Sequence, residues 1–196
     1  MFDTLLKPGR HGDTSGPAGV VATPAGRCAL ATVVAGRNRT DELAAALERR
    51  FAVRPPMRPG HAAGDGVGFV GVGPGRWLAL HAGNDGTAFE AALRDAVADR
   101  GAVTDQTDAF ALLDLSGPAV RKALAKGVTV DLHPVAFRPG DAATTPVNHI
   151  GVTFWQIDAA PAYRFAVPRS YAGSFLDWLL ASAAEYGIEA TPAGRG

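Results

Sequence analysis

Three side chains in the second half of the sequence are of the types that bind a metal or move a proton. Asp131 and His133 form an Asp-x-His pair, and His149 follows further along the chain. A zinc or catalytic site would also need a third ligand and supporting hydrogen bonds. Pro134 follows the pair at once, and an aspartate before a turn commonly accepts hydrogen bonds from nearby backbone N–H groups. We therefore favour a turn at Asp131 and His133 over a metal or catalytic site.

A glycine-rich stretch, GVGFVG over residues 66–71, matches the G-x-G-x-x-G pattern of dinucleotide-binding proteins. That pattern binds a pyrophosphate where a strand precedes it and a helix begins within it. Here a Pro/Gly-rich loop precedes the motif, and strand-like residues follow it as far as Gly73-Pro74-Gly75. The sequence predicts a hairpin here rather than a cofactor site.

Other sequence patterns of common active sites are absent. There is no G-x-S-x-G nucleophile elbow, no G-x-x-x-x-G-K-S/T phosphate loop and no H-E-x-x-H. Cys28 is the only cysteine and lies in an apolar run, which favours a buried, unreactive thiol. Trp77, Trp155 and Trp178 are expected to anchor a core or an interface. We predict no catalytic, cofactor-binding or metal-binding residue on this chain.

The composition is that of a globular protein with a sizeable core. The 196 residues are 47% hydrophobic and 19% charged, and 19 Lys+Arg balance 19 Asp+Glu. A net charge of zero gives no electrostatic attraction to nucleic acid or to an anionic membrane, so neither is an expected partner. No apolar run approaches membrane-spanning length, and a single cysteine is typical of a reducing compartment. We expect a cytoplasmic protein.

The first part of the chain has the element order of a ferredoxin-like unit, β-α-β-β-α-β. Thr40 and Thr87 are the expected N-caps of its two helices, and Glu90 completes a capping box with Thr87. The predicted elements are strands over 28–36, 67–72, 76–81 and about 102–115, and helices over 40–51 and 87–100.

The second part continues as α-β-β-α. Its first helix begins at Pro118, with Ser116 or Gly117 as the cap, and Gly127 is the expected left-handed C-cap. Predicted strands over 147–157 and 162–168 follow, and then a helix over 171–186 that Ser170 caps.

The long predicted strand at 102–115 belongs to both parts, which indicates one compact α+β domain over residues 25–190 made of two related halves. Residues 1–24 are rich in Gly, Pro and polar side chains and are predicted to be an N-terminal arm. Residues 191–196 are predicted to be a C-terminal tail.

Three segments resemble, in order and in spacing, the gamma subunit of heterotetrameric sarcosine oxidase. They are GPGRWLAL (73–80), DQTDAFALLDLSGPAVRKALAKGVTVDLHPVAFRPGDAATTP (105–146) and YRFAVPRSYAGSFLDWLLASAAEYG (163–187). That subunit is itself similar to the folate-binding domain of the glycine-cleavage aminomethyltransferases. The resemblance covers most of residues 70–188 and implies the fold of that domain.

The resemblance implies membership of a complex that oxidatively demethylates sarcosine, or a related N-methyl amine, to glycine. Hydrogen peroxide and formaldehyde or 5,10-methylenetetrahydrofolate would be the other products. Alpha, beta and delta subunits are the implied partners. FAD, FMN, NAD and zinc are implied on those subunits, with tetrahydrofolate as co-substrate of the complex.

The resemblance also implies that this chain is not the seat of the chemistry. The folate-binding relatives carry acids a few residues beyond a glycine in the strand that matches 147–157, and one of them is needed for catalysis. Here Gly151 is followed by VTFW, and Asp158 comes later, in a predicted turn. Asp105 matches the acid of the relatives' D-x-S-H segment, but one position cannot restore the activity. We expect a structural subunit.

Two alternatives remain open. A folate-dependent one-carbon transferase or repair protein acting alone would be favoured by an acid within 151–157. A ligand-binding regulator on a ferredoxin-like scaffold would be a soluble monomer with a closed pocket. For a subunit, the expected partner contacts are the N-terminal arm and the loops around Arg54, Arg58 and Arg138.

Overall fold

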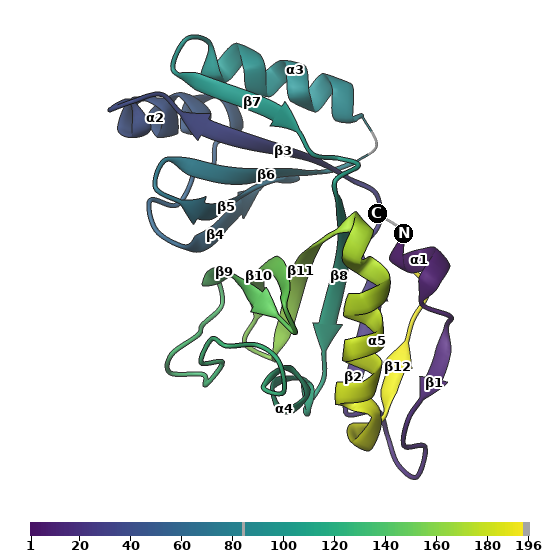
Figure 1. Cartoon of the computed structure of the whole chain (residues 1–196). Coiled ribbons are helices and arrows are strands. Elements are labelled where there is room, and N and C mark those ends of the chain that lie inside the picture. The colour runs from purple at the N-terminus through teal and green to yellow at the C-terminus, as the bar shows by residue number, and fades with distance from the viewer. Residues whose placement is uncertain (84, 194–196) are drawn as a thin grey trace. The chain divides into compact units, whose positions relative to one another are not determined.

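Both ends of the chain contribute strands to one sheet, and the middle of the chain forms another (Figure 1). The computed structural model describes residues 1–83 and 85–193. One compact unit combines Met1–Gly26 with the described chain from Phe110 onward, and the other is Arg27–Ala109. The sequence predicted a single domain over 25–190, whereas the structure has two units, each with its own sheet and core.

The middle unit has the predicted ferredoxin-like order with one added strand. Its sheet order is β4-β5-β6-β3-β7, and all neighbouring strands are antiparallel. The predicted β-α-β-β-α-β order is confirmed, and β4 is an edge strand in a segment predicted as loop. The elements are β3 (Cys28–Ala35), α2 (Thr40–Phe51), β4 (Gly60–Gly64), β5 (Val67–Gly73), β6 (Arg76–Ala82), α3 (Gly86–Val97) and β7 (Gly101–Asp105).

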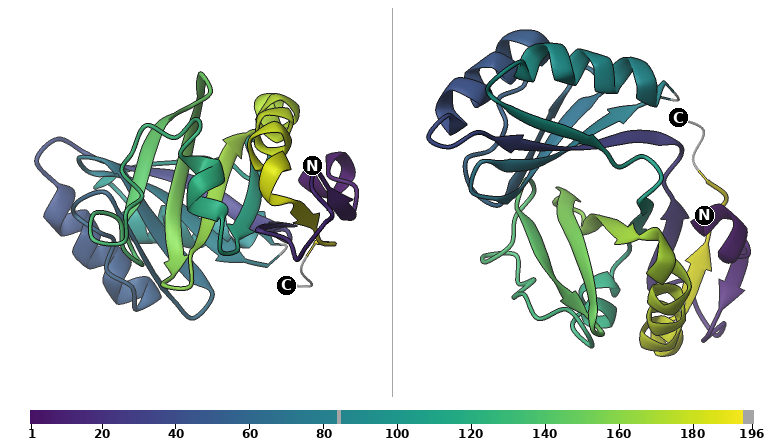
Figure 2. Two further views of the ribbon diagram at one scale, coloured as in Figure 1. Left: turned by 90° about the horizontal axis from the view of Figure 1, so that it is seen from below. Right: turned by 45° about the horizontal axis from the view of Figure 1, so that its top comes forward.

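Helices α2 and α3 cover one face of this sheet (Figures 1 and 2). Leu43 and Leu47 of α2 are fully buried, as is Leu93 of α3. Their four-residue spacing, together with Phe89 and Val97, turns one apolar stripe of each helix toward the strands. Burial of each such leucine contributes about 1.5–3 kcal/mol.

The helix starts in this unit differ from the predicted caps. Asp85 caps α3, because its Oδ1 accepts a hydrogen bond from the Ala88 N–H at 2.8 Å. Glu90 pairs with Arg94 instead of reaching back, so the predicted Thr87 capping box is wrong. The N-cap of α2 is Arg39, and Thr40 is the first helical residue. With Asp85 as its cap, α3 begins at Gly86, one residue before the predicted start. Thr87 therefore lies inside the first turn of α3.

The predicted long strand over 102–115 is broken between the two units. β7 ends at Asp105, and β8 (Phe110–Ser116) belongs to the other sheet. Asp105 Oδ1 accepts hydrogen bonds from the Thr107 N–H at 3.0 Å and from Thr107 Oγ1 at 2.7 Å. The Ala109 N–H donates to the Gln106 carbonyl. These local hydrogen bonds compete with the strand ladder and turn the chain.

The unit formed by both chain ends has a seven-stranded sheet in the order β1-β12-β2-β8-β11-β10-β9. Of these pairs only β12 with β2 is parallel, among the residues that the structure describes. The remaining elements are α1 (Phe2–Leu5), β1 (Gly9–His11), β2 (Val20–Pro24), α4 (Val120–Leu124), β9 (Ala142–Val147), β10 (Ile150–Asp158), β11 (Ala162–Pro168), η1 (Arg169–Tyr171), α5 (Ala172–Ala183), η2 (Ala184–Tyr186) and β12 (Ile188–Ala190).

Residues 1–24 are not the separate arm that the sequence predicted. Phe2 and Leu6 are buried in the core of this unit. β1 pairs with β12, and β2 lies between β12 and β8. The predicted tail begins at Thr191, whose N–H donates to the Ala22 carbonyl at 2.9 Å, and residues 194–196 lie outside the described part. Three-residue strands from opposite chain ends carry too little periodicity to be found in the sequence.

A row of aromatic rings runs through the core of the same unit. Successive ring centroids lie 4.9–5.5 Å apart, a separation at which aromatic pairs attract. The row connects the loop after α4 to β10, β11 and α5. Its members are Phe137, Phe154, Phe165, Phe175 and Trp178.

Gly127 is a close-packing position and not the predicted left-handed cap. α4 spans Val120–Leu124, so it begins two residues after Pro118 and ends three residues before Gly127. Gly127 has no positive φ. A Cβ atom at this position would lie 2.7 Å from ring atoms of Trp178. The glycine is needed here because the indole ring of α5 occupies the space of a side chain.

Candidate functional site

Asp131 and His133 form the turn that the sequence favoured. Asp131 Oδ1 accepts a hydrogen bond from the His133 N–H at 2.8 Å, and His133 Nδ1 accepts one from the Val135 N–H at 3.3 Å. His149 lies in the turn between β9 and β10 with φ of 69°. Within residues 1–83 and 85–193, no three His, Cys, Asp or Glu side chains are grouped so that they could hold a metal ion.

Strand β10 carries an apolar pair where the folate-binding relatives were expected to carry acids. Phe154 is fully buried and stacks on Phe165 with 4.9 Å between the ring centroids. Trp155, the next residue, is also buried. Asp158 ends the strand, and its Oδ1 accepts a hydrogen bond from the Ala160 N–H in the following turn. Between Gly151 and Ile157 the strand carries no carboxylate, and its one acid is the terminal Asp158.

Asp105, the other matched acid, holds the turn between the two sheets. Hydrogen bonds from the Thr107 hydroxyl and N–H lower the pKa of the Asp105 carboxyl below its usual value. A carboxylate that is stabilised in its charged form and engaged locally is a poor general base. Asp105 therefore stabilises the turn through its bonds to the Thr107 backbone and hydroxyl.

The GVGFVG motif lies in a hairpin strand and opens no helix. β5 pairs with β4 on one side and β6 on the other. Gly66 has φ of +81° in the turn before the strand, and a Cβ atom on Gly71 would lie 2.5 Å from the Arg58 carbonyl oxygen. These glycines permit a turn and a close backbone approach, and the motif lies in the predicted hairpin and not at a strand-to-helix junction.

The lone cysteine and the tryptophans have packing roles. Cys28 is half-buried, and its Sγ donates to the His81 carbonyl at 3.1 Å. Trp77 is buried, and its Nε1 donates to the Pro56 carbonyl at 2.7 Å. Trp155 is buried as well, and Trp178 packs against Phe175. The three tryptophans pack as the sequence predicted, whereas Cys28 is less buried than expected.

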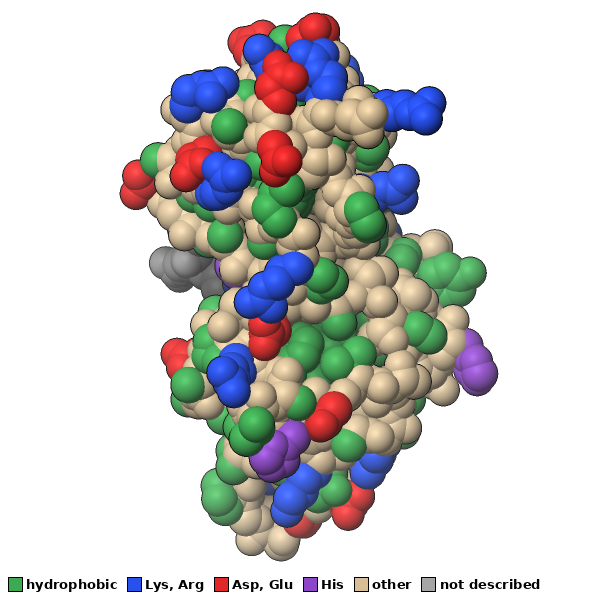
Figure 3. Space-filling model, turned by 90° about the vertical axis from the view of Figure 1, so that its left-hand side faces the viewer, with side chains coloured by type: hydrophobic (Ala, Val, Ile, Leu, Met, Phe, Trp, Pro, Cys, Tyr) green, Lys and Arg blue, Asp and Glu red, His purple; other side chains and the backbone are tan. Residues whose placement is uncertain are grey.

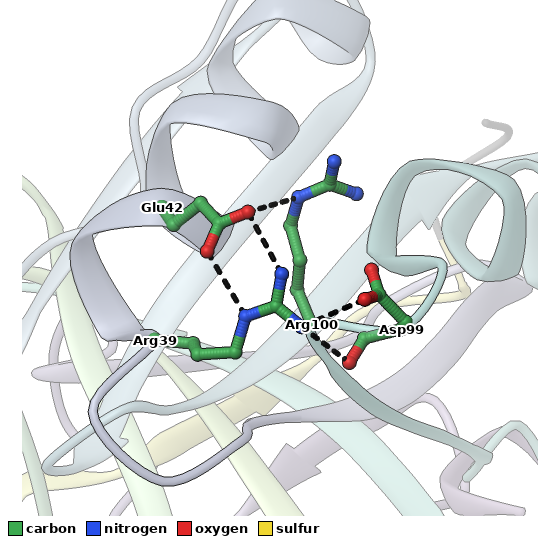
Figure 4. Close-up of polar contacts among 4 residues, drawn as sticks. All are labelled: Arg39, Glu42, Asp99 and Arg100. Atoms are coloured by element: carbon green, nitrogen blue, oxygen red, sulfur yellow. Dashed lines mark hydrogen bonds and ion pairs between the residues drawn. The ribbon is translucent and has the colours of Figure 1, made fainter.

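The most extensive charged network in the middle unit joins two turns (Figure 4). The Arg39 guanidinium donates to both Glu42 carboxylate oxygens at 2.9 Å, and to the Asp99 carboxylate at 2.9 Å. Arg100 Nε also donates to Glu42, at 3.0 Å. Hydrogen bonds from Arg39 are the main cause that lowers the pKa of Glu42 and of Asp99. The network ties the start of α2 to the turn before β7, and only the Arg39–Glu42 spacing signals it in the sequence.

The loop over residues 131–141 presents an apolar tip on a fixed base. Phe137 is buried under it and stacks on Phe154 with a 5.3 Å ring separation. At its far end the Arg138 N–H donates to Asp141 Oδ2 at 2.8 Å. Val135 at the tip is 69% exposed. Arg138 Nε donates to the Val135 carbonyl, and the Arg138 Nη groups have no partner among the described residues.

Of the other predicted contact residues, Arg54 donates to Glu48 at 2.7 Å on the surface of the middle unit.

Figure 3 shows positive and negative side chains interspersed on one face, without a large field of one sign. No helix in the described part of the chain is long and apolar enough to cross a membrane.

Comparisons with known proteins agree on one family. The model of the "Sarcosine oxidase, gamma subunit family" matches residues 36–185. The gamma subunit of sarcosine oxidase from Corynebacterium sp. (strain P-1) is 32% identical over 149 residues, covering 74% of this chain and 71% of the relative. The one from Arthrobacter sp. is 31% identical over 147 residues, covering 72% and 70%.

Solved structures give the same picture. A chain of the heterotetrameric sarcosine oxidase from Corynebacterium sp. U-96, in complex with pyrrole 2-carboxylate, is similar with a TM-score of 0.76 and 25% identity over 93% of this chain and 90% of that one. Aminomethyltransferase T of the glycine cleavage system from Bartonella henselae has a TM-score of 0.61 at 14% identity, over 89% and 48%. The second likeness is one of fold alone.

Proposed function

This chain belongs to the sarcosine oxidase gamma subunit family, and from that membership we propose that it is a structural subunit of a heterotetrameric complex that oxidatively demethylates sarcosine or a related N-methyl amine. The observation that carries the proposal is the match along 93% of the chain to a chain of heterotetrameric sarcosine oxidase. The products would be glycine, hydrogen peroxide and formaldehyde or 5,10-methylenetetrahydrofolate.

The side chains of β10 support a role without chemistry of its own. Proton transfer needs a titratable group within hydrogen-bond reach of the reacting atom. Phe154 and Trp155 fill this part of the strand with buried rings, and Asp158 is engaged in a turn. The fold of the aminomethyltransferase is therefore retained around a core that offers no acid for folate-dependent transfer at these positions.

The same reasoning assigns the cofactors to other subunits. The glycine motif at 66–71 opens no helix for a pyrophosphate, and Asp131 and His133 are engaged in a turn. Following the family resemblance, we propose that alpha, beta and delta partners hold FAD, FMN, NAD and zinc, with tetrahydrofolate as co-substrate of the complex. We propose a cytoplasmic location for a protein with this function.

The loop over residues 131–141 is the element that we expect to contact a partner subunit. Its fixed base lowers the entropy lost on docking, and Val135 offers an apolar tip. The outward Nη groups of Arg138 would pair with a carboxylate of the partner. The exposed valine and the unpaired arginine groups thus lie on one preorganised loop.

Co-expression with candidate large subunits tests the subunit role. The wild-type chain should purify in a stable, flavin-containing assembly and should be poorly soluble alone. A soluble monomer that binds tetrahydrofolate and turns it over would instead establish the free-standing one-carbon transferase.

Matched variants test the loop. Val135→Asp should reduce the yield of assembled complex about tenfold or more, because a charge would enter an apolar contact. Tyr171→Asp is the control, since Tyr171 is 54% exposed on the same unit and occupies the N-cap position of α5, where aspartate is favourable. Equal yields for wild type and Val135→Asp would exclude the loop while leaving the subunit role intact.

A further inference from the structure

The middle unit contains a surface pocket of about 500 Å³ between the end of α2 and the start of α3. We propose that this pocket binds a small zwitterionic molecule that carries a carboxylate, a cationic amine and a flat apolar group. The inference goes beyond the subunit role and does not depend on it. The size lies within the range of small-molecule sites in proteins.

The pocket has an aromatic floor. Phe51 from the last turn of α2 and Phe89 from α3 meet edge to face, with 6.1 Å between their ring centroids. Val67 at the start of β5 also lines the pocket and is buried. Apolar surface of this kind at the bottom of an open pocket favours a flat apolar body over a strongly hydrated ion.

The rim of the pocket carries two arginines that are not held by carboxylates among the described residues of this unit. Arg39, Arg54, Arg94 and Arg100 all form ion pairs with carboxylates of the unit. Arg49 and Arg50 line the pocket, and no carboxylate pairs with either of them in the described part of the chain. The Arg50 guanidinium instead lies 5.1 Å from the centre of the Phe51 ring. Two arginines beside an apolar floor are suited to a ligand carboxylate.

The lining also includes two acidic side chains, Asp65 and Asp85. Asp65, in the turn between β4 and β5, has no ion-pair partner among the described residues. Asp85 uses Oδ1 to cap α3, and no hydrogen bond of its Oδ2 is found among those residues. Each carboxylate can therefore accept a hydrogen bond from an amine.

His81 adds a polar group to the wall of the pocket. Its ring lies against Phe89 with 5.2 Å between the centroids. No partner of its ring nitrogens is found within residues 1–83 and 85–193. An imidazole offers a donor or an acceptor according to its tautomer, so it can hydrogen-bond either end of a ligand.

The combination of these groups selects the ligand class. A simple anion would be repelled by Asp65 and Asp85, and a simple cation by Arg49 and Arg50. A molecule with both charges can pair with the arginines and with the aspartates and can place its apolar body on the phenylalanines. An amino acid with an aromatic side chain has this chemistry.

Three probes test the class by calorimetric titration of the full-length chain, in whichever form it purifies, alone or assembled. Phenylalanine has both charges, 3-phenylpropanoate lacks the amine and 2-phenylethylamine lacks the carboxylate. Phenylalanine should bind, and the affinity of each analogue should be lower by about tenfold or more, because each leaves either the aspartates or the arginines of the pocket without a partner. Absence of phenylalanine binding at millimolar concentration, or equal binding of the three probes, would overturn the proposal.

A pair of variants on one helix tests the location. Ala92 lines the pocket, whereas Ala91 is exposed on the same helix and does not. Ala92→Trp should abolish phenylalanine binding, and Ala91→Trp should leave it within about twofold of wild type. Unchanged binding in Ala92→Trp, or equal loss in both variants, would contradict the site. Co-purification with partner subunits is measured separately, so failure here does not affect the subunit proposal.

Discussion

The two units of the chain are built from different kinds of sequence information. The middle unit uses consecutive residues, 27–109, and each of its strands pairs with strands of the same stretch. The other unit brings β1 and β2 from the start of the chain beside β12 from its end. The sheet of the middle unit therefore forms from one continuous stretch of sequence. The sheet of the other unit is complete only when strands from both ends of the chain pair.

The chemistry of the two units differs as well. The middle unit carries the Arg39–Glu42–Asp99–Arg100 network at its helix ends (Figure 4). The other unit, which both chain ends form, has a row of aromatic rings in its core that includes Phe154 and Phe165. Phe154 of this row lies in the segment of β10, residues 151–157, where an acid would have favoured a folate-dependent transferase and none is present. This arrangement agrees with the proposed structural role of the chain.

The largest expected loss of stability comes from truncating a buried apolar side chain in β12. Ile188→Ala should lower the free energy of unfolding by about 2–5 kcal/mol, because Ile188 is fully buried where the two chain ends pair. Hydrogen exchange should rise in β1 and β2 and stay unchanged in α2. Leu93→Ala is the matched control in the middle unit, with the opposite pattern of exchange. A uniform rise in both units would remove the distinction between them.

Gly127→Val should lower the free energy of unfolding by about 1–3 kcal/mol, because its side chain would collide with Trp178. The double variant with Trp178→Ala distinguishes packing from capping. If packing is the cause, the double variant loses less than the sum of the single losses in chemical denaturation. Additive losses would mean that the backbone conformation, and not the indole, requires glycine.

The cap of α3 gives a smaller effect. Asp85→Ala should lower the free energy of unfolding by about 1 kcal/mol, because the Ala88 N–H loses its acceptor. Thr87→Ala serves as the control and should change stability by less than about 0.5 kcal/mol. Thermal unfolding of the two variants checks the assignment, and the reverse order would restore Thr87 as the cap.

The smallest expected change in stability comes from substituting Asp105, and this change depends on pH. Its pKa is lowered in the folded state by the Thr107 hydrogen bonds, so its contribution to stability is present above the unfolded pKa of about 3.9. That contribution is lost as the pH falls through the lower folded pKa. Asp105→Asn should therefore cost a few tenths of a kcal/mol at neutral pH, given the exposure of the group, and nothing in strong acid. A cost that is independent of pH would contradict this account.

The sequence predicted the middle unit well because its signals are local. Leu43 and Leu47 repeat at helical spacing, and Gly73-Pro74-Gly75 marks a hairpin that the structure contains. The hydrogen bonds of Asp105 were not recognised, so one long strand was predicted where two sheets separate. The short terminal strands depend on contacts between distant residues, which no local pattern records.

Around the candidate sites, the sequence predicted local turns and packing residues but not the surface pocket. Asp131 before Pro134 signalled a turn, and the structure contains that turn. Trp77 and Trp155 were recognised as anchors. The pocket beside Phe51 and Phe89 was not found, because its lining comes from both helices and two strands, and its charges are far apart in the sequence.

The central claim is that this chain supports a catalytic complex without supplying a catalytic group. The most direct measurement is the turnover of sarcosine per bound flavin in complexes that carry His133→Ala, Asp105→Asn or Asp158→Asn in this chain. We predict turnover within about twofold of wild type for each variant, provided that the complex assembles. A fall of about a hundredfold in any fully assembled variant would be the size expected for loss of a general acid or base, and would contradict the claim.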